Sequence, residues 1–323
     1  MQSFKHLLLS SITLAAALTS VAAHAAFPEK RITLVVPTAA GGANDAMARV
    51  VGQAMSTILK QTVVVDNKAG ANGAIASEFV MRAPADGYTL LLGYVATHAM
   101  NPALQKLRYD PVKDFVPVGM VGSSATVMVI NPSLKATDAK GVVALLKASP
   151  GTISYASAGN GTAPHFAAEM FKLSTGTNML HVPYKGSAPA INDTVAGQTQ
   201  VMFPSLFTAL PQLKNGKLKA VGIAGSKRST LMPDVPTLKE QGINDVDVSQ
   251  WYAVFAPANT PSAVVETLNK ALNQALNDKS VAQRLEGQGA EVSTMTTSEA
   301  RTFLQQEQLK WKAVVQAAKL KAD

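Results

Sequence analysis

The sequence predicts an α/β protein folded into two similar lobes. Short apolar β-branched runs alternate with Gly- and Asn-rich loops and with segments whose apolar residues recur at helical spacing. This alternation is typical of βαβ units in a mainly parallel sheet covered on both faces. A chain of 323 residues is long enough for two domains. A content of 47% hydrophobic and 15% charged residues is typical of a well-packed globule.

The first 25 residues predict a secretory signal peptide. Lys5 supplies a positive charge, residues 7–18 form a short apolar stretch, and Ala23-His24-Ala25 fits the small-x-small cleavage rule. The stretch is shorter than the roughly 20 residues that a membrane-spanning helix needs. The chain contains no Cys, so there is no site for a lipid anchor and the fold must be stable without disulfide bonds. We therefore expect an exported protein whose mature chain is soluble.

The first lobe is expected to comprise residues 26–126 together with residues 250–323. Its predicted strands are 32–36, 62–65, 88–92 and 251–257. Its predicted helices are 46–58, 75–81, 264–276 and 298–319. Pro261 stands just before the helix over 264–276, where proline is well tolerated.

The second lobe is expected to comprise residues 127–249. Its predicted strands are 127–130, 153–155, 179–182, 201–203 and 220–224. Its predicted helices are 138–146, 166–173, 189–196 and 207–215. Asn131-Pro132 ends the first of these strands, and Pro150-Gly151 follows the first helix.

Two loops are predicted to bind an anion, one in each lobe: residues 38–45 and 157–165. Each leaves a strand, is rich in small residues and opens a helix. Gly lets the backbone approach a ligand closely, and the first turn of a helix presents unpaired N–H groups at the positive end of its dipole. The alternative is an ordinary turn with Asn44 or Asp45 as the helix N-cap. Two such loops facing one cleft favour a carboxylate clamp, whereas for the loop over 66–73 a purely structural turn is favoured.

Motifs for catalysis and metal binding are absent from the sequence. There is no Gly-x-Ser-x-Gly elbow, no His-Glu-x-x-His and no Walker loop. His98, His165 and His181 do not lie at metal-ligand spacing. We therefore expect neither a cofactor nor a metal. A secreted α/β enzyme acting on a carboxylate stays as an alternative, with Asp45 and His165 as the only plausible acid–base pair.

The net charge of +8 favours attraction toward anionic solutes over nucleic-acid binding. Lys and Arg are scattered singly, with no basic run, no interleaved aromatic residues and no nucleic-acid motif. We therefore expect no nucleic-acid partner.

A series of short motifs resembles the Bug family, the TctC-like receptors of tripartite tricarboxylate transporters. The signal peptide comes first, and the other motifs follow in the family's order along the chain. They are Pro-x-x-x-Gly-Gly-x-x-Asp at 37–45, Asn-Lys-x-Gly-x-x-Gly at 67–73, Ala-Asp-Gly-Tyr-Thr-Leu at 85–90, Tyr-Ala-Ser-Ala-Gly at 155–159 leading to His165, Val-Pro-Tyr-Lys-Gly at 182–186, and Trp-Tyr at 251–252 with Phe-Ala-Pro at 255–257.

The resemblance implies a type II periplasmic-binding-protein fold, with crossing strands between two lobes and the ligand in the interdomain cleft. It also implies that the two anion loops grip one carboxylate through backbone N–H groups and ordered waters, with Asp45 orienting a water or the loop. The residues implied at this carboxylate are Ala40, Gly41, Gly42, Asp45, Ser157, Gly159, Asn160, Thr162 and His165. Thr38 is a further predicted ligand-binding residue. For the far end of the ligand we expect Tyr94, Lys185 and Ser205, with Thr97, His98, Ser187 and Phe207 as further candidates.

One departure from the family pattern concerns the shape of the pocket. Many members carry Phe after the first Pro and Pro before the Gly pair, where this chain has Thr38 and Ala40. The pocket is therefore expected to be roomier or more polar. Tyr184, Trp251 and Tyr252 are expected to be core or hinge residues.

The sequence thus predicts a monomeric periplasmic solute-binding protein. It would capture a small organic carboxylate, a dicarboxylate or an aromatic acid, and deliver it to the membrane permease of a tripartite tricarboxylate transporter. A receptor that passes ligand occupancy to a signalling partner is a further alternative.

Overall fold

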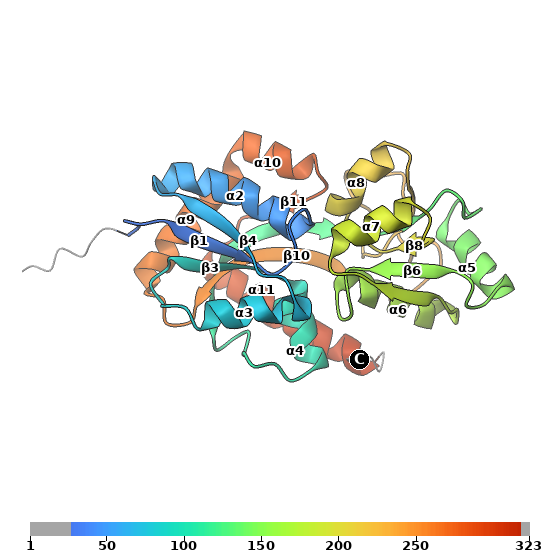
Figure 1. Ribbon diagram of the computed structural model, residues 1–323, viewed down its shortest axis with the longest axis horizontal. Coiled ribbons are helices and arrows are strands. Elements are labelled where there is room, and N and C mark those ends of the chain that lie inside the picture. Colours follow the sequence, from blue (N-terminus) through green and yellow to red (C-terminus); the bar gives the residue numbers. More distant parts are fainter. Residues whose placement is uncertain (1–26, 318–323) are drawn as a thin grey trace, which may run out of the picture.

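The computed structural model describes residues 27–317, and the signal peptide predicted for residues 1–25 lies outside them. Two β-sheets form the centres of two halves of the molecule (Figure 1). The chain leaves the first sheet through strand β4 (Phe115–Ala125), enters the second through β5 (Val127–Ile130) and returns through β10 (Ser249–Pro257). The space between the halves is therefore flanked by loops from both sheets.

The first sheet has six strands in the order β11-β4-β10-β3-β1-β2. Strands β1 (Ile32–Val36), β2 (Val63–Asn67) and β3 (Thr89–Tyr94) pair in parallel. Strands β4, β10 and the short β11 (Glu291–Val292) pair antiparallel. The prediction of a mainly parallel sheet is therefore wrong, because β4 runs out of this half and its neighbour β10 runs back into it.

Helices cover both faces of this sheet (Figure 1). On one face, α2 (Ala43–Leu59) packs with α9 (Ser262–Asn277) and α10 (Lys279–Glu286). The other face carries α3 (Ala74–Met81), α4 (Asn101–Leu104) and α11 (Thr297–Ala317). Two shorter elements, the 3₁₀ turn η1 (Ala71–Gly73) and the π-helix η2 (Ala96–Met100), precede α3 and α4.

The second sheet has five strands in the order β7-β6-β8-β5-β9. Strand β6 (Ser154–Ser157) pairs in parallel with β7 (Leu180–Pro183) and β8 (Val201–Met202), whereas β5 pairs antiparallel with β8 and β9 (Lys219–Ile223). Helices α7 (Ser187–Val195) and α8 (Leu206–Lys214) lie on one face, and α5 (Ala139–Ala148) and α6 (Ala163–Thr175) on the other. This sheet, too, is mixed rather than mainly parallel.

Apolar side chains on both faces of the second sheet form two separate core layers. On β6, Tyr155 packs in the larger cluster with Phe166 and Phe171, whereas the next residue, Ala156, packs in a second cluster beneath α7 and α8. Consecutive residues of a strand point to opposite faces, so one strand supplies both layers. Trp311 of α11 also lies edge-on to Phe166 of α6, with ring centroids 5.4 Å apart. The C-terminal helix therefore packs against both halves.

Most predicted elements lie within a few residues of the observed ones, but β4, α4, α10, β11, η1 and η2 were not predicted. Strand β4 contains Pro117, Gly119 and Gly122, residues that normally interrupt strands. It forms nonetheless because its pairing with β10 extends over its whole length, with register shifts beside both glycines.

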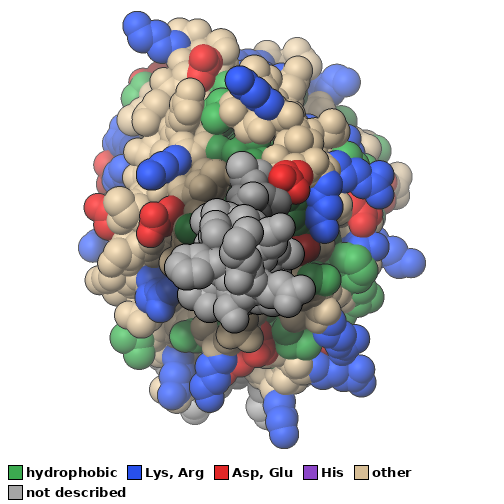
Figure 2. Space-filling view, turned by 90° about the vertical axis from the view of Figure 1, so that its left-hand side faces the viewer, with side chains coloured by type: hydrophobic (Ala, Val, Ile, Leu, Met, Phe, Trp, Pro, Cys, Tyr) green, Lys and Arg blue, Asp and Glu red, His purple; other side chains and the backbone are tan. Residues whose placement is uncertain are grey.

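Charged side chains are dispersed over the end of the molecule shown in Figure 2. Lys and Arg alternate there with Asp and Glu and with uncharged residues. Across residues 27–317, no helix combines the length and the apolar character needed to cross a membrane.

Candidate functional site

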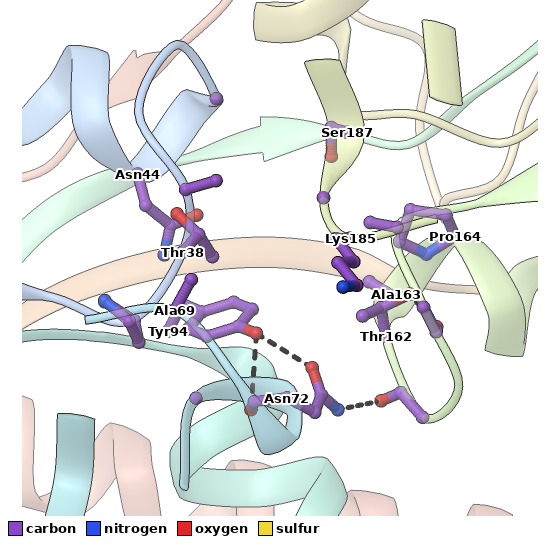
Figure 3. Close-up of a pocket in the computed structure, with 18 of the residues that line it drawn as sticks. Thr38, Asn44, Ala69, Asn72, Tyr94, Thr162, Ala163, Pro164, Lys185 and Ser187 are labelled. Carbon is purple, nitrogen blue, oxygen red and sulfur yellow. Dashed lines mark hydrogen bonds between the residues drawn. The ribbon is translucent and has the colours of Figure 1, made fainter. Parts of the chain in front are cut away.

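A cavity of about 730 Å³ lies between the two halves. Its walls come from the loops that lead into α2, α3, α6 and α7, so the N-termini of four helices meet there. Figure 3 shows Thr38, Asn44, Ala69 and Tyr94 on one side, facing Thr162, Ala163, Lys185 and Ser187 on the other. The two predicted anion loops therefore face one cleft.

The first anion loop is held by Asp45. Its carboxylate accepts the backbone N–H of Gly41 at 3.0 Å and forms an ion pair with Arg49, whose guanidinium lies 2.9 Å away. Burial alone would raise the pKa of Asp45, but the hydrogen bonds from Arg49 and Gly41 outweigh burial and lower the pKa below its ordinary value. Asp45 stays ionised and orients the loop. Neither Asp45 nor Gly41 lies on the cavity wall.

Two polar atoms of this wall are buried and have no hydrogen-bond partner among the described residues: Thr38 Oγ1 and Asn44 Nδ2. Asn44 is only 6% exposed. The N-cap of α2 is Gly42, in extended backbone and without a side-chain cap, so Asn44 and Asp45 are inside the helix rather than capping it. A buried polar atom without a partner is costly. These donors and the free N–H groups of the first turn are therefore suited to a bound anion.

The second anion loop is held by two of the predicted ligand-binding side chains. Gly159 N–H donates to Ser157 Oγ at 3.1 Å, and Gly161 N–H donates to His165 Nδ1 at 3.1 Å. Ser157 Oγ is itself 2.7 Å from His181 Nε2. Ser157, predicted to bind the ligand, is fully buried below the loop and does not belong to the cavity wall. The N–H groups of Gly159 and Gly161 are engaged inside the loop.

A stack of rings lies beneath this loop. His165 stacks on His181 with centroids 4.4 Å apart, and His181 stacks on Tyr155 at 4.7 Å. The Tyr155 hydroxyl donates to Glu169 at 2.6 Å, and Lys172 pairs with the same carboxylate at 2.8 Å. Burial alone would raise the pKa of Glu169, but the hydrogen bonds from Lys172 and Tyr155 outweigh burial and hold the pKa below its ordinary value. These stacked rings and hydrogen bonds hold the second anion loop in place from below.

The loop over 66–73 also contributes to the cavity, although the sequence favoured a purely structural turn. Ala69, Gly70, Ala71, Asn72 and Gly73 all lie on the wall. The signal that could have indicated this is the Gly-x-x-Gly spacing directly before helix α3, the same small-residue strand-to-helix pattern as in the two anion loops.

The far wall is formed by the start of α7 and by neighbouring strand ends. Lys185 is the single Lys, Arg, Asp or Glu among the described residues of the wall. Tyr184 and Tyr252, expected to be core or hinge residues, line the cavity as well. Burial, together with a 2.8 Å hydrogen bond to Asp193, raises the pKa of Tyr184 to about 12, so this hydroxyl stays protonated. Trp251 is buried and donates to Glu307 at 2.7 Å, away from the cavity.

The structure brings most of the predicted site residues into the lining of one cavity. These are Thr38, Ala40, Gly42, Tyr94, Gly159, Asn160, Thr162, His165, Lys185, Ser187 and Ser205. Lining residues that sequence reasoning missed include Asn44, Asn72, Asn101, Gln105 and Gln250. Each is a single amide side chain, and Asn44 and Asn72 occupy variable positions of the motifs at 37–45 and 67–73.

Three further candidates for the far end of the ligand are core residues. The Thr97 hydroxyl is bonded to the backbone N–H and C=O of Tyr94, each at 3.0 Å. The His98 ring stacks on Phe255 at 3.7 Å. Phe207 is 5% exposed and does not line the cavity. The side chains expected after β3 point into the core because the chain enters a π-helix there, which turns them away from the cleft.

The wall is suited to bind an anion. Four helix N-termini without side-chain caps and one lysine face the cavity, and its described lining contains no carboxylate. Within residues 27–317 no group of three or more His, Cys, Asp or Glu is placed to hold a metal ion.

Comparison with known proteins places the chain among transporter receptors. Residues 47–320 match the model of the tripartite tricarboxylate transporter family receptor. Protein BugT of Bordetella pertussis is 38% identical over 299 residues, covering 91% of this chain and 92% of that protein.

Solved structures show the same fold. A Rhodopseudomonas palustris protein solved with adipate superposes with a TM-score of 0.88 at 30% identity, covering 91% of this chain and 99% of that one. MatC from Rhodopseudomonas palustris with bound malate superposes with a TM-score of 0.85 at 33% identity, covering 90% and 100%. Other solved relatives are described as a periplasmic transporter and a periplasmic binding protein. The two-lobed periplasmic-binding-protein fold is therefore confirmed.

Proposed function

The chain belongs to the family of tripartite tricarboxylate transporter receptors, and from this membership we propose that it captures a small organic carboxylate in the periplasm. We further propose that it delivers the acid to the permease of such a transporter. Members of this family are solute-binding receptors and not enzymes.

The observation that carries the carboxylate proposal is the electrostatic character of the cavity. Uncapped helix N-termini, the buried donor of Asn44 and the ammonium group of Lys185 all favour negative charge. Because no Asp or Glu belongs to the described wall, no negatively charged side chain there repels an anion. Adipate and malate in the solved relatives are acids of this class.

Binding is proposed to couple to closure of the two lobes. We assign residues 26–126 and 250–323 to one lobe and residues 127–249 to the other, so that the chain crosses between them near Thr126 and before β10. A ligand that contacts loops from both sheets favours the closed arrangement over the open one.

A thermal-shift screen tests the proposal. The mature protein is heated with a panel of small carboxylates, malate and adipate included, and with the corresponding neutral amides. An acid present at about 100 times its dissociation constant stabilises the fold by roughly 2.7 kcal/mol, a clear shift of the midpoint. We expect at least one acid to shift the midpoint and its amide not to do so. Equal shifts by acid and amide, or no shift with any acid, would contradict a carboxylate receptor.

Replacing Lys185 by Met is expected to weaken binding of the acid that the screen identifies. The Lys185 side chain is exposed and therefore screened by solvent, so we expect a loss of about 0.5–1 kcal/mol, or roughly 2- to 5-fold in Kd. Isothermal titration calorimetry measures the change. Lys217→Met serves as the matched control, because Lys217 is exposed and does not line the cavity. The same loss in both variants would show that net charge alone, and not contact with the ligand, is responsible.

A further inference from the structure

The loop between β2 and α3 has an unusual backbone. Gly70, Ala71, Asn72 and Gly73 follow one another with φ of 134°, 46°, 48° and 89°. Left-handed backbone is unfavourable for residues other than Gly, and Asn tolerates it better than Ala does. Two consecutive non-glycine residues in this region need compensating interactions nearby.

The Asn72 side chain provides them, and its amide uses every hydrogen-bonding group. Nδ2 donates to the backbone carbonyl of Gly161 at 2.7 Å and to Oδ1 of Asn101 at 2.7 Å. Oδ1 accepts a hydrogen bond from the Tyr94 hydroxyl at 2.9 Å (Figure 3). The backbone carbonyl of Asn72 accepts Nδ2 of Asn101 at 3.0 Å. The orientation of the amide is therefore fixed.

The partners of Asn72 come from opposite halves of the molecule. Tyr94 ends β3 and Asn101 begins α4, so both hold the amide from its own side of the cleft. Gly161 lies in the loop between β6 and α6, on the other side. The approach is close, since a Cβ added at Gly161 would lie 3.1 Å from Asn72 Nδ2. The hydrogen bond from Asn72 to Gly161 thus joins the two halves of the molecule at the edge of the cavity.

We propose that Asn72 is an interlobe latch, a positioning residue that holds the cleft closed through its hydrogen bond to Gly161. The inference rests on the proposed receptor function, because a latch has a role only where the lobes open to admit a ligand. The bond forms without any group from a ligand, so it stabilises the closed arrangement before and after binding. A ligand can leave only after this bond has broken, and the latch therefore slows dissociation.

The test uses two substitutions compatible with left-handed backbone. Asn72→Gly removes the side chain and suits a φ of 48°. Asn72→Asp keeps the acceptor for Tyr94 but places an oxygen against the carbonyl of Gly161, where the amide donates now. Lys60→Gly is the matched control, since Lys60 also has left-handed backbone, with a φ of 53°, but ends α2 away from the cavity.

The first measurement needs no ligand. The chain contains no Cys, so spin labels on Lys106→Cys and Ser174→Cys, exposed positions on opposite sides of the cleft, report the distance between the halves by double electron–electron resonance. In the parent protein we expect part of the population to show a short distance between the two labels, which represents the closed state. Asn72→Gly should shift the ratio of closed to open protein about 3- to 10-fold toward the open state, and Asn72→Asp by more. Lys60→Gly should change nothing. Identical distance distributions in the parent and in Asn72→Gly would overturn the latch.

The second measurement separates the latch from the proposed function. Malate and adipate are titrated against each variant, and dissociation is followed by stopped flow. We expect a 3- to 10-fold faster dissociation in Asn72→Gly, and an association rate that rises only in proportion to the open fraction of the ligand-free protein. If neither acid binds the parent protein, the ligand class is wrong, while the ligand-free distances still decide the latch. Unaltered dissociation of a bound acid would count against the latch whatever the distances show.

Discussion

Gly42→Val is expected to abolish ligand binding while leaving the fold intact. Gly42 is the N-cap of α2, and its backbone has φ of −85° and ψ of 174°, a conformation that any residue adopts. A Cβ at this position would meet only the carbonyl of Ala39, at an ordinary 3.7 Å. The two methyl groups of Val, however, would occupy the cavity beside the uncapped first turn of α2. We expect Kd to rise by at least about 100-fold, or roughly 2.7 kcal/mol.

Calorimetric titration with the acid found in the thermal-shift screen measures this loss, and the ligand-free melting midpoint reports the fold. Gly42→Ala is the matched control and should weaken binding much less. Gly159→Val is a poorer test, because Gly159 has a φ of 121° and an added Cβ would lie 3.1 Å from the carbonyl of Tyr184. That variant is expected to lose stability as well. Tight binding by a stable Gly42→Val protein would refute an anion site at the start of α2.

Local sequence patterns predicted the elements that depend on local chemistry. The apolar runs at 32–36 and 127–130 have the same bounds as β1 and β5, because each is β-branched and ends at a loop or at Asn-Pro. The two anion loops were predicted from small residues that precede a helix, and both line the cavity. Helix α10 was missed because its start depends on Asp278, which also follows directly on the end of α9.

Relationships between distant residues could not be predicted in this way. Asn72 and Gly161 are 89 residues apart in sequence, and nothing in either segment indicates the other. The roles of Asp45 and Ser157 are a related case. The family resemblance gave Asp45 the role of orienting a water or the loop, and its side chain accepts a loop N–H, whereas Ser157 was expected at the ligand and its hydroxyl also accepts an N–H of its own loop. Residue type alone does not separate a side chain that contacts a ligand from one that holds the loop.

The second large effect is expected in the stability of the protein in acid, and it arises from His98. This side chain is completely buried, stacks on Phe255 at 3.7 Å, and its Nε2 has no hydrogen-bond partner among the described residues. Burial lowers the pKa of His98 from 6.5 to about 3, because an imidazolium there would lose its hydration without gaining a partner. The folded protein therefore keeps His98 neutral at pH values where the unfolded chain has bound the proton.

Between about pH 6.5 and pH 3 the unfolded state binds one more proton at this residue than the folded state does. The stability that a neutral His98 provides is fully present above pH 6.5 and is lost as the pH falls, at about 1.4 kcal/mol per pH unit. From pH 6.5 to pH 4 this amounts to roughly 3 kcal/mol.

Urea unfolding of the parent protein and of His98→Gln between pH 6.5 and pH 4 measures this loss of stability, because the carboxylates titrate alike in both proteins. His98→Gln will be less stable near pH 7, since it disturbs the stack, but its stability should fall less steeply in acid. Parallel curves would show that His98 is protonated in the folded protein, and that its site is more polar or more open than the packing against Phe255 and Phe115 implies.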